Sequence, residues 1–254
     1  MRAMVLAAGL GTRLRPLTDD RPKALVEIAG RTMLEITLSR LRDFGIRQVI
    51  INVHHLADVL VNYLRQRNNF GMNIEVSRED VLLDTGGGLK KAAYFFAGSN
   101  EPFLLHNVDV ISTVDFNRIV AHHREHHALA TLAVQDRPSP RHLFFDARLQ
   151  LCGRRINGQS HEEIARSATN LTPLAFSGIH IISPQIFELL TEEGAFSIIE
   201  PYLRLAGEGE RILGFRADEY YWRDLGKLES IRQAEEDLQS GTFHLSAWPS
   251  AGQT

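Results

Sequence analysis

The chain has 254 residues, of which 44% are hydrophobic and 23% charged, and a formal net charge of −3, the balance of an ordinary globular protein. This length allows one large domain or two small ones, and the slightly acidic balance gives no electrostatic reason to expect binding to nucleic acid or to acidic membranes. The single cysteine, Cys152, excludes an intramolecular disulfide, and no apolar run approaches the roughly 20 residues of a membrane span. We therefore expect a cytoplasmic protein.

Strand-like apolar runs alternate with helical patterns through the first half of the chain. We expect strands at Met4–Ala7, Gln48–Val53, Asn73–Ser77 and Phe103–His106, and helices at Thr32–Phe44, Ala57–Arg67 and Leu89–Phe96. This alternation predicts an α/β fold with right-handed βαβ units in a mostly parallel, Rossmann-like sheet. Ligands bind beyond the carboxyl ends of such strands. One rim is therefore expected to collect Gly9–Arg13, Asn52–His54 and Asn107–Asp109.

The pattern changes in the second half of the chain. After a helix over Asp115–His127 and a strand over Ala128–Val134, the segment Arg137–Thr172 is rich in Pro, Gly and Arg, which predicts a small β-rich lid. Further strands are expected at Leu174–Ile182, Arg211–Phe215 and Tyr220–Arg223, and helices at Gln185–Leu190, Ser197–Leu205 and Lys227–Leu238. We interpret residues 1–240 as a single domain, made of a core (1–135), the lid with returning strands (136–226) and a C-terminal helix (227–240), followed by a weakly patterned tail (241–254).

The first strand runs into a glycine-rich loop that carries two cations. Glycines let the backbone turn with φ > 0 and present its amides to an anion, and Arg13 and Lys23 add positive charge. The Walker pattern needs four residues between its glycines and a Lys-Ser/Thr pair after the second, and neither is present. The dinucleotide fingerprint needs a third glycine where this chain has Leu14, which argues against a dehydrogenase. The loop therefore predicts a polyphosphate site of another kind.

The same loop carries a family resemblance. Gly9-x-Gly11-x-Arg13-x-x-Pro16-x-Thr18, followed by Pro22-Lys23, resembles the signature of sugar-1-phosphate nucleotidylyltransferases. The resemblance implies a glycosyltransferase-A-like nucleotidyltransferase fold and an enzyme that joins a nucleoside triphosphate to a sugar 1-phosphate and releases pyrophosphate. It also implies that Arg13 and Lys23 are catalytic. The nucleotide-binding residues implied in the same way are Leu6, Ala7, Ala8, Gly9, Gly11, Thr12, Asn52 and Asn107.

Two carboxylates stand at strand ends far apart in the sequence. Asp109 follows a buried strand, and Asp224 lies in Trp222-Arg223-Asp224-Leu225-Gly226. Two carboxylates together with substrate phosphate oxygens are what Mg²⁺ usually accepts from proteins. The alternative is that one residue caps a helix and the other forms an ion pair. The resembling family holds its metal with an Asp after a Gly-Asp step and another in a W-x-D-x-G motif, which implies a Mg²⁺ cofactor on Asp109 and Asp224.

Two further segments resemble ligand-contacting parts of the family. Asp84-Thr85-Gly86-Gly87 is similar to the turn that contacts the base and the sugar, which implies sugar binding by Asp84 and nucleotide binding by Thr85, Gly86 and Gly87. Physically, amides at a helix N-terminus favour an anion or a base carbonyl, although a plain turn at the start of a helix is the alternative. Ser177-Gly178 inside a strand indicates close backbone approach, by a sugar or in a β-bulge, and His54 is a further candidate for contacting the base.

The chain departs from the family in two places. Val108 stands where the family usually has Gly, and the Glu-Lys-Pro motif, whose lysine holds the sugar phosphate in many members, is absent. We expect Lys227 or an arginine of 137–166 to replace that lysine. The shortened lid resembles the small uridylyltransferases acting on N-acetylmuramic acid 1-phosphate, so we expect UTP with that substrate or a related hexose 1-phosphate. The alternatives are GTP with mannose or heptose 1-phosphate, and a catalytically inactive nucleotide-sugar-binding regulator.

Other expected properties are a monomer or small homo-oligomer and no nucleic-acid or membrane partner. His122-x-x-Glu125-His126 matches an inverted zinc-protease pattern, but no third ligand is indicated on this solvated, amphipathic helix. Nothing local to Cys152 would lower the pKa of its thiol. We therefore expect neither zinc catalysis nor a cysteine nucleophile.

Overall fold

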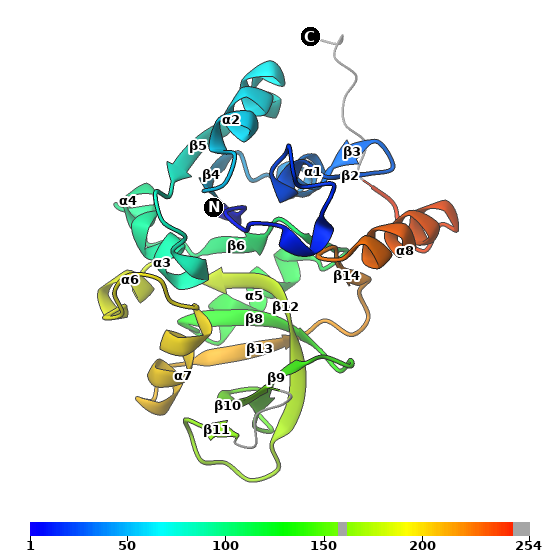
Figure 1. Ribbon diagram of the computed structural model, residues 1–254. Helices are drawn as coiled ribbons and strands as arrows, with labels where there is room; N and C mark the ends of the chain where they lie inside the picture. The colour runs from blue at the N-terminus through cyan, green and yellow to red at the C-terminus, as the bar shows by residue number, and fades with distance from the viewer. Residues whose placement is uncertain (157–161, 246–254) are drawn as a thin grey trace.

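The protein is described by a computed structural model, in which residues 1–156 and 162–245 are placed (Figure 1). A ten-stranded sheet forms its centre, as predicted in outline. The strands of this sheet are β1 (Arg2–Leu6), β4 (Gln48–Val53), β5 (Asn73–Arg78), β6 (Phe103–Asn107), β8 (Ala130–Gln135), β9 (Arg141–Phe145), β10 (Leu151–Ile156), β11 (Glu163–Ile164), β12 (Thr172–Ile182) and β13 (Ile212–Arg216).

Strand direction places several carboxyl ends at one edge of this sheet. β1 pairs in parallel with β4 and β6, and β4 with β5. β12 is antiparallel to both β6 and β8, and β13 is parallel to β8. Six strands therefore run in one direction around the reversed β12, which confirms the mostly parallel α/β sheet. Their carboxyl ends lie on one rim.

Helices cover both faces of the sheet because its buried strands are apolar on both sides. Ala3 and Val5 of β1 point into one core and Met4 into the other, with the two-residue period of a strand. The first core packs against α1 (Met33–Asp43), α2 (Ala57–Gln66), α5 (Phe116–Glu125) and α8 (Leu228–Gln239). The second packs against α3 (Asp84–Lys91), α4 (Ala93–Phe96), α6 (Ile186–Leu189) and α7 (Ile199–Gly207).

Local signals define several of these helices as predicted. The Thr32 side chain accepts a hydrogen bond of 3.1 Å from the amide of Glu35 and caps α1, and Asp115 caps α5 in the same way. Gly45, at φ +77°, follows the end of α1. In the described part of the chain, no helix is both long and apolar enough to span a membrane.

The predicted β-rich lid continues the main sheet. β9 pairs with the outer end of β12, β10 with β9, and β11 with β10, all antiparallel. Figure 1 shows these strands extending away from α1 and α2. Residues 157–161 of the predicted lid and 246–254 of the predicted tail lie outside the described residues. The described start of the tail packs on the domain, with Phe243 stacked on Tyr221 at 4.3 Å between ring centroids.

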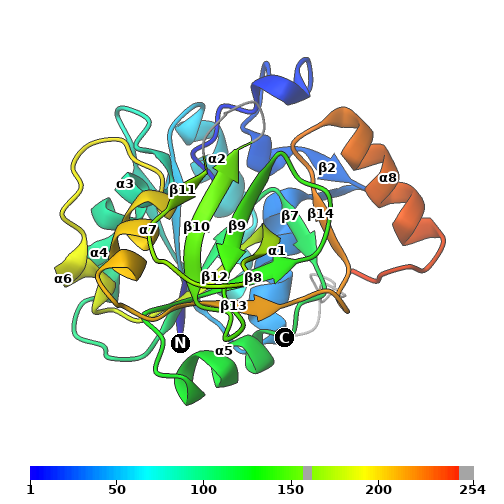
Figure 2. The same ribbon diagram turned by 90° about the horizontal axis from the view of Figure 1, so that it is seen from below.

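Two short ribbons stand beside the main sheet. β2 (Glu27–Ile28) pairs with β3 (Arg31–Thr32), and β7 (Val110–Ser112) pairs with β14 (Trp222–Asp224). Figures 1 and 2 both show β14 next to α8, where Arg223 forms an ion pair of 2.6 Å with Asp237. The sequence did not predict β7, and this strand determines the position of Asp224.

Candidate active site

A cavity of about 490 Å³ opens at the carboxyl rim of the sheet. Its walls come from the ends of β1, β4 and β6, from the start of α3 and from the 3-10 turn at Lys23. The lining residues are Leu6, Ala7, Ala8, Gly9, Lys23, Asn52, Leu82, Asp84, Thr85, Asn107, Val108, Asp109 and Ala195. The rim predicted from strand ends therefore coincides with a cavity.

Gly9 and Gly11 have different roles in the glycine loop. Gly9 is exposed at the cavity, and a methyl group built on it would meet nothing within 4 Å. Gly11 has φ +67°, and a methyl group there would lie 2.9 Å from Thr18 Cγ2 and 3.1 Å from Lys23 Cβ. The Thr18 hydroxyl donates a 2.9 Å hydrogen bond to the Gly11 carbonyl. The motif spacing thus folds the loop onto the segment that carries Lys23, and Gly11 and Thr12 lie outside the cavity wall.

Lys23 and Asp109 form an ion pair inside this cavity. Lys23 Nζ donates to Asp109 Oδ2, and the two side chains are 11% and 20% exposed. A partly buried carboxylate is costly without a cation or several donors, so each group stabilises the other. The cation predicted from the start of the chain and the carboxylate predicted from the end of β6 therefore meet.

The β7–β14 ribbon brings Asp224 beside Asp109. Asp224 is in register with Val110, and the Leu225 amide donates a 2.8 Å hydrogen bond to the Asp109 carbonyl. The Asp224 carboxylate accepts a 2.6 Å hydrogen bond from the Gly226 amide. It does not cap α8, which begins at Leu228 without a side-chain cap. The alternative role of Asp224 as a helix cap is therefore wrong.

Arg13 lies on the Asp224 side of the site. A methyl group built on Gly226 would be 2.6 Å from Arg13 Nη2 and 2.6 Å from Asp224 Oδ1. The exposed guanidinium of Arg13 therefore lies against Gly226, where a side chain would collide with it. Among residues 1–156 and 162–245, no three Asp, Glu, His or Cys side chains form a metal cluster.

Glu79 organises the wall of the cavity around Asn52, and the sequence analysis missed it. This buried carboxylate accepts a 2.7 Å hydrogen bond from the Asn52 side-chain amide and a 3.0 Å bond from the Leu83 amide. Asn52 in turn accepts a 2.8 Å bond from the Ala7 amide. Glu79 thus ties three segments together. His54, bonded at 2.8 Å to the Glu79 carbonyl, does not line the cavity.

The glycines after Asp84 lie inside α3, and not in a turn before it. Asp84 and Thr85 reach the cavity as predicted, but Gly86 and Gly87 are buried. Their amides donate hydrogen bonds of 2.9 and 3.3 Å to the Phe196 carbonyl, so they are not available to a ligand. Methyl groups would overlap the Phe196 ring at Gly86 and the Gly194 carbonyl at Gly87. The absence of side chains therefore serves packing between α3 and residues 194–196.

Ser177 and Gly178 form a bulge in β12. The register with β8 shifts between Phe176 and His180, and Gly178 has φ +73°. A methyl group on Gly178 would lie 2.9 Å from the Asn107 side chain, so the close approach that the glycine permits is made by Asn107. The Ser177 carbonyl accepts a 2.8 Å hydrogen bond from the Trp222 indole. This bulge joins the cavity to β14.

The remaining sequence candidates lie away from this site. His122 and His126 have ring centroids 4.3 Å apart, but they belong to no three-residue metal cluster in the described chain. Cys152 is buried, and burial raises the pKa of its thiol.

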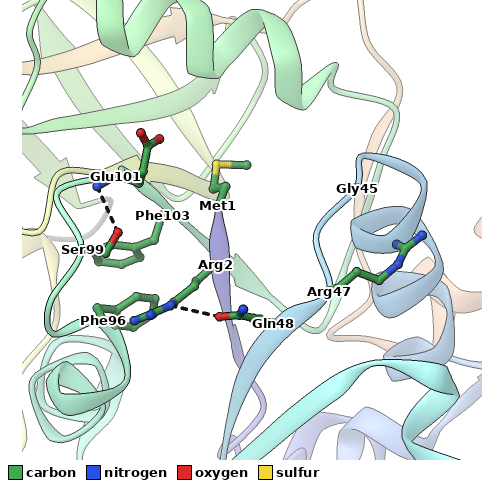
Figure 3. Close-up of a pocket in the computed structure, with 9 residues that line it drawn as sticks. All are labelled: Met1, Arg2, Gly45, Arg47, Gln48, Phe96, Ser99, Glu101 and Phe103. Carbon is green, nitrogen blue, oxygen red and sulfur yellow. Dashed lines mark hydrogen bonds between the residues drawn. The ribbon is translucent and has the colours of Figure 1, made fainter.

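A second cavity, of about 320 Å³, lies at the opposite edge of the sheet (Figure 3). It is lined by the starts of β1, β4 and β6 and the loops around them, through Met1, Arg2, Gly45, Arg47, Gln48, Phe96, Ser99, Glu101 and Phe103. Arg2 donates a 3.1 Å hydrogen bond to Gln48 across it. None of the predicted site residues lines this cavity.

Comparison with known proteins agrees with this fold. The family described as "Nucleotidyl transferase" matches residues 2–143. The chain belongs to this family, within the sugar-1-phosphate nucleotidylyltransferases. It is 35% identical to the N-acetylmuramate alpha-1-phosphate uridylyltransferase of Caulobacter vibrioides, over 93% of this chain and 96% of that protein.

Two more distant proteins complete the comparison. The mannose-1-phosphate guanyltransferase of Candida albicans is 28% identical over 95% of this chain and 64% of its own length. HddC of Yersinia pseudotuberculosis, solved in complex with GMP-PN, superposes with a TM-score of 0.72 at 21% identity, covering 93% of this chain and 99% of that one. At this identity the structural match supports the fold alone.

Proposed function

We propose that this protein is a uridylyltransferase that joins UTP to N-acetylmuramic acid 1-phosphate, or to a related hexose 1-phosphate. The observation that carries the catalytic part is the ion pair of Lys23 and Asp109 at the rim cavity, with Asp224 on the strand that pairs next to Asp109. The choice of substrates is supported by the Caulobacter relative, which this chain matches over nearly all of both lengths.

In the proposed reaction, an oxygen of the sugar phosphate attacks the α-phosphorus of the triphosphate. The bond between the α-phosphorus and the oxygen bridging to the β-phosphate breaks, and pyrophosphate leaves with that electron pair. No general base is needed because the attacking phosphate is already ionised at neutral pH. Catalysis then rests on positioning and on neutralising charge.

The residues of the cavity supply these two effects. Lys23 stands at the cavity wall to neutralise the α-phosphate and the approaching sugar phosphate. The exposed backbone at Gly9 offers room for phosphate oxygens, and Arg13 is the cation for the leaving pyrophosphate on the Asp224 side. Asn52, fixed by Glu79, faces the base.

The paired carboxylates fit a Mg²⁺ ion. Asp109 directly precedes β7 and Asp224 ends β14, its pairing strand, so both can supply hard oxygen ligands. Mg²⁺ commonly takes one or two carboxylates with substrate phosphates and water. When bound, the ion would neutralise phosphate charge at the reacting centre. Lys23 would then be released from Asp109 to act on the phosphates.

Pyrophosphate release tests this proposal. The protein is incubated with Mg²⁺, with UTP or GTP, and with N-acetylmuramic acid, glucose or mannose 1-phosphate, and products are identified by mass spectrometry. We expect release with UTP and the muramic substrate. A preference for GTP and mannose 1-phosphate would replace the uridylyl assignment, and nucleotide binding without release would indicate the regulator.

A further inference from the structure

One arginine near the site, Arg137, forms no ion pair with a carboxylate of the described residues. Arg137 follows the carboxyl end of β8, a strand that runs in the same direction as β1 and β6. Its guanidinium carbon lies 3.5 Å from the centre of the Trp222 ring. Side chains two apart on a strand share a face, so Trp222 directs Arg137 along the face of β14 that carries Asp224.

The guanidinium of Arg137 is held in place by one hydrogen bond, while its Nε donor has no partner among the described residues. Nη2 donates a 2.9 Å hydrogen bond to the Phe176 carbonyl, next to the β12 bulge. Nε is buried without a hydrogen-bond partner among the described residues, and none of the carboxylates there forms an ion pair with Arg137. Burial lowers the pKa of Arg137 to about 10, while the Asp224 charge acts in the opposite direction. A desolvated cation with free donors favours an anion.

The bulge supplies a second unused donor. Ser177 is fully buried, and its hydroxyl has no hydrogen-bond partner in the described chain. Its carbonyl holds the Trp222 indole, and the adjoining Phe176 carbonyl holds Arg137. Arg137 is therefore held by the bulge whose Gly178 packs against Asn107, and Asn107 lines the cavity.

The remaining lysines and the arginines of 137–166 are engaged elsewhere or exposed. Lys90 bonds to Glu193 at 2.7 Å, and Lys91 donates to the Arg78 carbonyl. Arg154 and Arg155 pair with Glu163 and Glu162 across the lid hairpin. Lys227 is exposed at the start of α8. Arg141 and Arg148 are exposed, and Arg166 lies beside β10, where its amide donates a 3.0 Å hydrogen bond to the Cys152 carbonyl. Arg137 combines partial burial with a fixed position on Trp222 and forms no ion pair among the described residues.

We propose that Arg137 holds the phosphate of the sugar 1-phosphate, in the role that a lysine performs in many family members. This inference rests on the proposed function and names the residue that binds its second substrate. The guanidinium lies on the Asp224 side of the site, where the reacting phosphates would meet the aspartates. We therefore assign Arg137 to the phosphate of the sugar substrate and not to a carboxylate elsewhere on the sugar.

Arg137→Met tests the assignment, since methionine still covers the Trp222 ring but carries no charge. We expect the KM for the sugar 1-phosphate to rise about 10- to 100-fold, with the Kd for UTP and the melting temperature close to wild type. Arg137→Lys should recover part of the loss. Inorganic phosphate should compete with the sugar 1-phosphate in the wild type and more weakly in Arg137→Met. Arg148→Met, which removes an exposed arginine near the start of β10, is the matched control.

Several results would overturn the inference. These are an unchanged KM in Arg137→Met, an equal rise in Arg148→Met, or a rise in Lys227→Met alone. A rise confined to N-acetylmuramic acid 1-phosphate, and absent with N-acetylglucosamine 1-phosphate, would assign Arg137 to the carboxylate and reject the phosphate. Calorimetric titration of wild type and Arg137→Met with each sugar 1-phosphate requires no turnover. If the proposed function is wrong, the wild-type protein will release no pyrophosphate. The titration would still decide whether Arg137 binds the sugar phosphate.

Discussion

A methyl group added at Gly9 should affect ligand binding, and one added at Gly87 should affect the free energy of unfolding. A methyl on Gly9 meets nothing within 4 Å, and its φ lies outside the left-handed region. Gly9→Ala should therefore leave the free energy of unfolding unchanged or raise it by about 0.4–1 kcal/mol, because alanine has fewer unfolded conformations. If phosphates bind against the Gly9 backbone, the methyl collides with them. The Kd for UTP should rise at least about tenfold, or about 1.4 kcal/mol.

Gly87→Ala should act on the fold. The methyl would overlap the Gly194 carbonyl and lie 3.1 Å from Leu83 Cβ, and backbone atoms give way poorly. Overpacking of this kind costs about 1–3 kcal/mol, which lowers the melting temperature by roughly 2–12 °C for a chain of this size.

Calorimetric melting and UTP titration with Mg²⁺ separate the two effects. Wild-type affinity in Gly9→Ala would refute binding of phosphate against that backbone. A wild-type melting temperature in Gly87→Ala would refute the packing role of the α3 glycines.

Three further predictions concern charge. Lys23→Met should lower kcat about 10²–10³-fold, because it removes a cation where charge concentrates, and a turnover within a few-fold of wild type would exclude that role. Asp224→Asn keeps an acceptor for the Gly226 amide, so we expect an unchanged melting temperature with a Mg²⁺ requirement shifted to higher concentration; an unchanged Mg²⁺ titration of pyrophosphate release would contradict this. Burial lowers the pKa of His106 to about 4 and of His180 to about 3. As the pH falls, these histidines are therefore protonated in the unfolded chain before they are protonated in the folded protein. The free energy of unfolding should decrease as the pH drops from about 6.5 to about 4, by about 2 kcal/mol for each histidine at pH 5. Urea unfolding at pH 7 and pH 5 measures this decrease, and equal free energies of unfolding would refute it.

The parts of the fold that depend on local signals could be predicted from the sequence. Apolar runs fixed the positions of β1, β4 and β6, and the Thr32 cap fixed the start of α1. The glycine loop, with Lys23, was recognised because its residues lie within one short stretch. Strand ends then predicted the rim, since parallel strands bring their carboxyl ends together.

Other parts depend on packing between distant segments. β7 has only three residues, too few for periodicity to reveal, and its pairing with β14, a strand expected at Tyr220–Arg223, joins segments far apart in the sequence. The start of α3 was placed too late because glycine disfavours helices, and the sequence does not show that Phe196 requires glycine there. Glu79 and Arg137 have no motif, and their importance becomes visible only through Asn52, Trp222 and the bulge that surround them.

The β7–β14 ribbon also has a consequence for how the protein is made. It joins a carboxylate from residue 109 to one from residue 224, and the family match over residues 2–143 contains only the first. On the ribosome, the emerging polypeptide presents the glycine loop, Lys23 and Asp109 while Trp222 and Asp224 are not yet translated. The candidate site therefore cannot assemble until the chain has been translated through Asp224.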